Sequence, residues 1–160
     1  MNIPSGEEVV KNLEVKGIKT SSMIKDLNNK KFNGYVSITI REKFGFEDGV
    51  IIFKDGEISG SYYNFLLKNK ELYGKDAFTF VMNAFGAEFG SLDVNKLSKE
   101  QVELMLTFNE KSKFELKLKD LQKKIKTKYD ENLVSQEIGI DVKDEKYELF
   151  KKIGLGNLGI

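Results

Sequence analysis

The sequence predicts an α+β fold: a small antiparallel β-meander of three to four strands packed with helices, plus a long C-terminal helical segment. Three observations predict it. Polar and apolar residues alternate over residues 35–41, an Asp-Gly pair separates two strand-like runs, and apolar residues recur at helical spacing beyond residue 74. A chain of 160 residues is long enough to bury a hydrophobic core without disulfides or metal.

The meander is predicted between residues 31 and 65. Alternation over 35–41 is typical of a half-buried strand, and the run 50–53, apolar on both faces, predicts a central strand. Asp55-Gly56 tolerates the positive φ angles of a tight hairpin into a third strand, 58–63. Glu47-Asp48-Gly49 is expected to close the other hairpin.

Within the third strand, Gly60 is expected where a side chain would crowd a neighbour or where a bulge occurs.

Two helices are expected to flank the meander. Thr20-Ser21-Ser22 offers N-cap hydroxyls to a short helix that ends at Asn28-Asn29. Residues 75–85 carry a buried helical stripe and stop at Gly86, and residues 89–94 could add a short strand.

The C-terminal third is expected to be helical. Ser98 and Gln101 form a capping-box pattern that opens a periodic stretch over 99–129, with Leu104 and Phe108 on one face. A heptad-like set follows, namely Phe114, Leu118, Leu121 and Ile125.

Residues 109–112 predict a break in this stretch, and whether it forms one helix or two stays open. We expect a linker over 130–140, then a helix over 142–153 capped by Asp141 and ended by Gly154. The predicted domains are 1–109, an α+β domain, and 110–160, a Lys-rich helical extension with a C-terminal helix and flexible tail.

The composition excludes much chemistry. The chain has no His and no Cys, so it offers no imidazole base, thiol nucleophile or Cys/His metal site. The remaining acids near the strands are expected to be turn formers; they are Glu47, Asp48, Asp55 and Glu57. We therefore expect no catalytic, cofactor-binding or metal-binding residues, and no enzyme activity.

Two apparent nucleotide motifs lack their structural context. Residues 154–159 match G-x-G-x-x-G, but a helix is expected before them and one residue follows, so a helix C-cap and tail explain them better. Gly74-Lys75 is followed by Asp76 instead of the Ser or Thr of a P-loop. No cofactor is therefore predicted.

Two surfaces are candidates for binding a partner protein. At the sheet edge, Tyr62 and Tyr63 precede Phe65, and at least one Tyr ring is expected near the surface. Residues 111–128 hold eight Lys and two acids, a local charge of +6, with Lys117 and Lys124 as tentative contacts. The alternatives are that the rings are partly buried edge residues and that the Lys face is merely solvated.

Other partners are expected less. The net charge is +1 and Arg41 is the one Arg, whereas nucleic-acid readers rely on Arg, so nucleic acid is an unlikely partner. No stretch reaches about 18 apolar residues and the first ten residues do not resemble a signal peptide, so we expect no membrane contact and a cytoplasmic protein. A homo-oligomer is compatible with the sequence.

Several ordered patterns between residues 17 and 109 resemble known families. A short helix at 17–27 precedes Gly34 and a strand, then Phe53-Lys54-Asp55-Gly56-Glu57-Ile58, then a helix opened by Gly74-Lys75-Asp76-Ala77. This order resembles a PATAN-type domain, and the run through 97–111 is similar to an archaeal family of conserved uncharacterised proteins. The matched positions are read as fold-determining.

The resemblance implies a non-catalytic protein-interaction or adaptor module, in signalling or as an accessory subunit, whose partner is another protein in trans. PATAN-type domains accompany receiver domains, which this chain lacks. The alternative is a small-ligand sensor or accessory enzyme subunit with an apolar pocket between sheet and helices.

Overall fold

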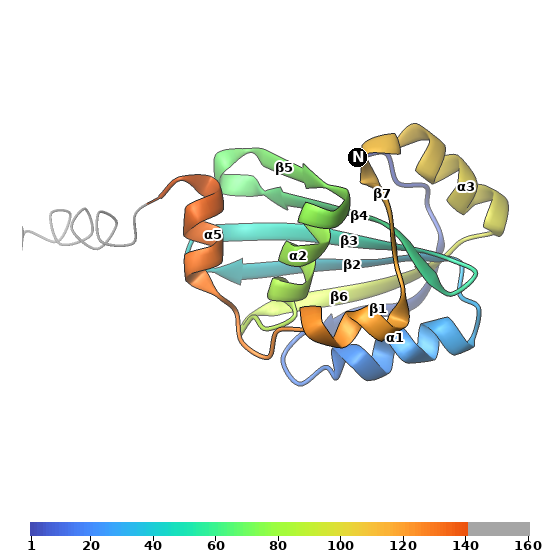
Figure 1. The fold of residues 1–160 in the computed structure, drawn as a ribbon, viewed down its shortest axis with the longest axis horizontal. Coiled ribbons are helices and arrows are strands. Elements are labelled where there is room, and N and C mark those ends of the chain that lie inside the picture. The colour runs from blue at the N-terminus through green and yellow to red at the C-terminus, as the bar shows by residue number, and fades with distance from the viewer. Residues whose placement is uncertain (141–160) are drawn as a thin grey trace, which may run out of the picture. The chain divides into compact units, whose positions relative to one another are not determined.

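The computed structural model describes residues 1–140 and has an α+β fold (Figure 1). The chain divides into two compact units, Met1–Tyr129 and Asp130–Ile160. The first unit thus continues beyond the boundary predicted after residue 109. The expected helix over 142–153, with Asp141 and Gly154, lies outside the described residues.

Seven strands of the first unit form one antiparallel sheet, in the order β1-β6-β2-β3-β4-β5, with β7 also paired to β4. The strands are β1 (Glu7–Glu14), β2 (Gly34–Glu42), β3 (Gly45–Lys54), β4 (Glu57–Phe65), β5 (Lys70–Tyr73), β6 (Gly90–Lys96) and β7 (Lys113–Leu116). The helices of this unit are α1 (Thr20–Asn29), α2 (Gly74–Ala84), α3 (Lys99–Phe108) and α4 (Leu118–Leu121). Short 3₁₀ turns are η1 (Leu66–Lys68), η2 (Glu110–Ser112) and η3 (Gln122–Lys124).

The predicted three-stranded meander is confirmed as β2, β3 and β4. Asp55 and Gly56, at φ 50° and 83°, make the predicted tight turn between β3 and β4. Gly60 lies at a bulge, where the register shifts between Ile52 and Phe53 of β3. A Cβ on Gly60 would also lie 3.0 Å from the Ser112 carbonyl oxygen, so both reasons offered for this glycine hold.

The prediction of a three-to-four-strand sheet is wrong, because β1, β5, β6 and β7 extend the meander to seven strands. The hairpin expected at residues 47–49 is also wrong, since the chain turns at Lys43-Phe44 and residues 47–49 lie inside β3. Gly49 has a packing role instead of a turn role. A Cβ there would lie 2.9 Å from Cγ2 of Val81 on α2.

The predicted long helical segment is not found, although the break expected at 109–112 is confirmed. Residues 113–116 form β7 because β5 pairs only with residues 62–65 of β4, which leaves the edge at Ile58–Gly60 free to pair. The linker expected over 130–140 instead contains helix α5 (Glu131–Ile138). Asp130 caps α5 by accepting from two backbone amides, and Gly139 ends it at φ 72°.

Helices cover both faces of the sheet. Helix α2 crosses the front face in Figure 1, where it packs against β4 and β3. Alternate residues of β3 and β4 point the other way, and Val50, Ile52 and Tyr62 pack in one cluster with residues of α3. The sheet therefore lies between α2 on one face and α3 on the other.

Candidate interaction surface

Helix α3 begins with the predicted capping box. The Ser98 hydroxyl accepts a hydrogen bond from the Gln101 backbone amide at 3.1 Å, and the Gln101 side chain accepts from the Ser98 amide at 2.9 Å. Two amides at the helix start are thereby satisfied. The first residue of α3 is fixed at the end of β6.

The inner side of α3 is apolar. It contributes Val102, Met105 and Leu106, all buried. They pack against buried side chains of three strands and the connection before α3, namely Tyr35, Val50, Ile52, Tyr62 and Leu97. This contact holds the helix against the sheet.

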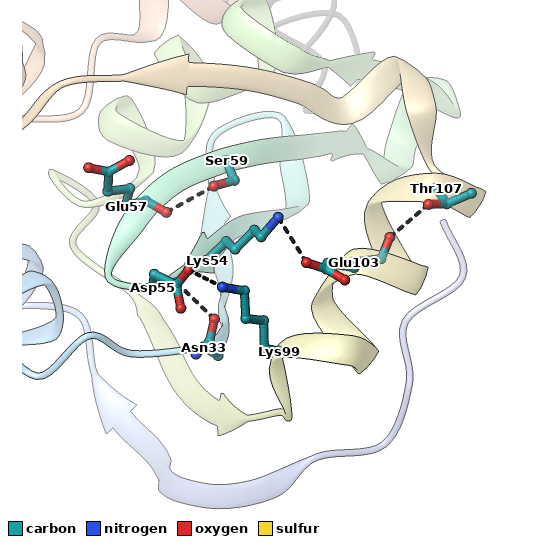
Figure 2. A network of polar contacts seen from close by, with 8 residues as sticks. All are labelled: Asn33, Lys54, Asp55, Glu57, Ser59, Lys99, Glu103 and Thr107. Atoms are coloured by element: carbon teal, nitrogen blue, oxygen red, sulfur yellow. Dashed lines mark hydrogen bonds and ion pairs between the residues drawn. The ribbon is translucent and has the colours of Figure 1, made fainter.

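Ion pairs join α3 to the β3–β4 hairpin (Figure 2). The Lys99 ammonium lies 2.8 Å from Oδ2 of Asp55, and the Lys54 ammonium lies 3.1 Å from Oε1 of Glu103. Oδ1 of Asn33 accepts a hydrogen bond from the Asp55 backbone amide at 2.8 Å, which adds the segment before β2 to the network. The hydrogen bond from Lys99 lowers the pKa of Asp55 below its usual value.

At its other end, α3 holds the N-terminal segment. Oδ1 of Asn109 accepts from the Asn2 amide at 3.2 Å, while its Nδ2 donates to the Asn2 carbonyl at 2.9 Å and to the Met105 carbonyl at 2.8 Å. One side chain thus ends the helix and fixes residues 2–4 beside it. The Pro4 carbonyl also accepts a hydrogen bond from the Tyr35 hydroxyl at 3.4 Å.

These contacts leave an apolar surface facing outward, which we call the outer α3 patch and define as Ile3, Leu104 and Phe108. Their side chains are 38%, 56% and 69% exposed. Leu104 and Phe108 are four residues apart and therefore share a helix face. They line a shallow depression of about 360 Å³ together with Ile3, Pro4 and Met105.

The aromatic candidates from the sequence lie inside the fold. Tyr62, Tyr63 and Phe65 are 8%, 0% and 2% exposed, so the expectation that one Tyr ring lies near the surface is wrong. β5 pairs with this part of β4 and turns it from a sheet edge into an interior strand. The Tyr62 hydroxyl donates to Glu71 at 2.6 Å, and burial together with this bond raises the pKa of Tyr62.

Tyr63 belongs to a buried polar cluster on the α2 face. Its hydroxyl donates to Oε1 of Glu47 at 3.0 Å, and the Tyr129 hydroxyl donates to Oε2 at 2.5 Å. Burial raises the pKa of Glu47, although the hydrogen bonds from the Tyr129 and Tyr63 hydroxyls lower it. Glu47 therefore connects β3 to Tyr129, the last residue of the first unit, and it is not the turn residue that was expected.

The two lysine candidates lie apart. Lys117 is exposed and precedes α4, while Lys124 is partly buried at the end of η3. Lys117 borders a depression of about 340 Å³ with residues of α1 and the Asp55-Gly56 turn. The segment 111–128 is not one continuous helix, so these lysines do not form the expected single helical face.

The remaining predicted absences concern metals and membranes. Among residues 1–140, no group of three or more Asp or Glu side chains could hold a metal ion. Within the same range, no helix is both long and apolar enough to cross a membrane.

Sequence reasoning placed Leu104 and Phe108 on one face but did not recognise that this face points outward. The missing information was the tertiary position of α3, because Val102, Met105 and Leu106 form a second apolar stripe on the same helix. Asn2 and Ile3 carried no recognisable signal, because their position depends on the hydrogen bonds between Asn2 and Asn109, which are 107 residues apart in the sequence.

The chain matches one protein-family model over residues 1–109, described as an uncharacterized protein conserved in archaea (DUF2226). The chain belongs to this archaeal family. The match includes α3 and the whole outer α3 patch, whereas β7 and Tyr129 lie beyond it. No curated protein and no solved structure matches the chain.

Proposed function

We propose that this member of the archaeal family is a non-catalytic protein-interaction module that binds another protein in trans through the outer α3 patch. The observation that carries the proposal is the exposure of Ile3, Leu104 and Phe108 side by side on a helix that is fixed at both ends. Adjacent exposed apolar side chains are typical of interaction sites.

The rigidity of the patch favours this role. A surface that is already ordered loses less conformational entropy on binding than a mobile one. The capping box, the two ion pairs and the hydrogen bonds of the Asn109 side chain order α3 in the absence of a partner. The resemblance to PATAN-type domains agrees with an adaptor role in signalling or within a larger complex.

The test compares partner recovery by matched variants. The wild-type chain and two Phe variants, Phe108→Asp and Phe89→Asp, serve as bait in archaeal lysate with crosslinking. Phe89 is 66% exposed and lies outside the patch, so it matches Phe108 in residue type and exposure. We expect wild type and Phe89→Asp to recover the same partner and Phe108→Asp to lose it.

Recovery of the same protein by all three baits would overturn the outer α3 patch as the contact surface. Recovery of the chain alone, as a monomer by light scattering, would overturn the adaptor function. If the recovered partner is a second copy of this chain, the module is a homo-oligomer and the light-scattering mass of Phe108→Asp falls to that of a monomer.

A further inference from the structure

A groove separates β1 from α1, on the opposite side of the sheet from α3. It has a volume of about 570 Å³ and a mostly apolar lining. Leu92 and Leu27 are buried at its base, whereas Val9 and Leu13 of β1 are 55% and 44% exposed along its wall. Small-molecule sites commonly have volumes of roughly 300–1,000 Å³.

Irregular pairing of β1 builds this wall. The register against β6 shifts between Glu8 and Val10 and again between Val10 and Leu13. In a regular strand Val9 and Val10 would point to opposite faces, but both line the groove. The second shift contains Asn12, at φ 54°, whose amide donates to Asp93 at 2.7 Å.

The same bulges disfavour a peptide strand as the occupant. An added strand needs an uninterrupted row of outward-facing backbone N–H and C=O groups, and bulges on an edge strand break that row. The side chains of the groove, rather than the backbone of β1, are therefore the groups that a ligand would contact.

Charge is concentrated at one end of the groove. Lys96 lies opposite Glu7 in the β1–β6 register, and Leu13 lies opposite Leu92 at the other end. The loop after α1 brings Lys31 to the charged end, because the Leu97 amide donates to the Asn33 carbonyl at 2.9 Å.

The balance at this end favours an anion. Lys30 forms an ion pair with Asp26, with its ammonium 2.9 Å from Oδ2. Lys31 and Lys96 make no ion pair with any residue in the described part of the chain, and Glu7 is the one unpaired acid beside them.

We propose that this groove binds a free single-chain amphiphile with an anionic headgroup, a carboxylate or a phosphate. The apolar chain lies along Val9, Val10 and Leu13 for about 13 Å, the length of the four steps of β6 between Lys96 and Leu92. The headgroup lies between Lys31 and Lys96. This site is separate from the outer α3 patch, so it does not depend on the proposed protein partner.

The first experiment is calorimetric titration of the full chain with decanoate, dodecanoate and 1-decanol, each below its aggregation limit. We expect saturable 1:1 binding of dodecanoate, roughly tenfold tighter than decanoate because two more methylenes are buried. We expect 1-decanol to bind several-fold more weakly than decanoate. Absence of saturable binding, or equal affinity for decanoate and 1-decanol, would overturn the proposal.

Two matched pairs of variants locate the site. Leu13→Glu should weaken dodecanoate binding at least tenfold, whereas Leu67→Glu, at an exposed Leu outside the groove, should not. Lys31→Glu should weaken dodecanoate binding several-fold but leave 1-decanol binding unchanged. Lys25→Glu is its control, because Lys25 is exposed on α1 and does not line the groove. Equal effects within either pair would show nonspecific surfactant binding and overturn the assignment.

A sedimentation assay separates a free amphiphile from a lipid surface. Vesicles of phosphatidylglycerol present the same kind of anionic headgroup with its chains held in a bilayer. We expect the wild-type chain to stay in the supernatant. Pelleting of wild type that Leu13→Glu abolishes would overturn the free-ligand proposal in favour of a membrane surface.

Discussion

Helices α2 and α3 lie on opposite faces of one sheet and differ in how they are held. Helix α2 buries most of its surface, including Phe78, Phe80 and Val81, and Gly49 allows it to approach the sheet closely. Helix α3 buries three apolar side chains, and polar contacts at both of its ends complete its attachment.

The difference separates two uses of a helix. Burial around α2 contributes to folding stability, since buried apolar area stabilises by about 25 cal/mol per Å². Helix α3 buries a narrower apolar stripe, which contributes less stability but leaves its other apolar face available. A chain that had to expose an apolar surface to a partner could do so on α3 without weakening its core.

The largest test of this comparison replaces one Phe on each helix with Ala. Phe78 is 1% exposed, and its ring centroid lies 5.2 Å from that of Phe114 in a tilted contact, so Phe78→Ala should lower the free energy of unfolding by about 3–5 kcal/mol. Phe108 is 69% exposed, and Phe108→Ala should change the free energy of unfolding by less than about 0.5 kcal/mol. Urea unfolding measures both, and similar losses would show that the two helices do not differ.

The next test concerns how closely each helix approaches the sheet. Gly49→Ala should cost about 1–3 kcal/mol by overpacking, because its Cβ would meet β-branched Val81 and Ile38 and the ring of buried Tyr63. Gly60→Ala, on the α3 side, should also be destabilising, because its Cβ would lie 3.0 Å from the Ser112 backbone carbonyl, although the side-chain ends of Ile52 and Leu106 can move away. Chemical unfolding measures both variants, and an unchanged stability of Gly49→Ala would contradict the close approach of α2 to the sheet.

The meander could be predicted because its signals are local. Alternation in β2 and the positive-φ requirement at Asp55-Gly56 each depend on a few adjacent residues, and both predictions are confirmed. The capping box at Ser98 is local in the same way. Such features are set by backbone sterics and nearest neighbours before the chain has a tertiary structure.

Features that depend on distant partners could not be predicted. Gly49 was predicted to be a turn residue. Glycine is found both in tight turns and where a helix packs closely on a strand, because it has no Cβ, and the sequence does not distinguish the two cases. The heptad-like spacing after Phe114 suggested a helix, but the free edge of β4 makes residues 113–116 a strand. Glu47 is buried and accepts a hydrogen bond from Tyr129, 82 residues later in the chain.

The buried carboxyl of Glu47, on the α2 face, gives a pH-dependent test. The folded pKa of Glu47 is raised, so its protonated form favours the fold, and stability falls as pH rises from the ordinary Glu value, near 4.5, through the raised value. Glu47→Gln mimics the protonated carboxyl and should be less pH-sensitive over that window. Thermal unfolding between pH 4 and pH 8, roughly the range of such shifts, measures the difference.

The control for this experiment is Glu71→Gln, because the Tyr62 and Tyr73 hydroxyls hold the pKa of Glu71 below its usual value. Its stabilising effect is present above the ordinary Glu pKa and is lost as pH falls, the opposite sign to Glu47. A Glu47→Gln curve parallel to that of wild type would mean that Glu47 titrates normally in the fold.

The smallest expected effect belongs to the ion pair that fixes the start of α3. Asn can adopt the φ of 50° found at Asp55, so Asp55→Asn keeps the turn and removes the charge that faces Lys99. Because the folded pKa of Asp55 is lowered, its contribution is present above the ordinary Asp value and is lost as pH falls through the folded value. We expect a small decrease in Tm at neutral pH that shrinks at high salt.

The matched background is Lys99→Gln, in which Asp55→Asn should have no further effect, because the pair is already broken. Hydrogen exchange of the α3 amides reports whether the pair orders the helix, and faster exchange in the first turn alone is expected. A core-sized loss of stability in Asp55→Asn would mean that this ion pair, more than the buried stripe of Val102, Met105 and Leu106, holds α3 to the sheet.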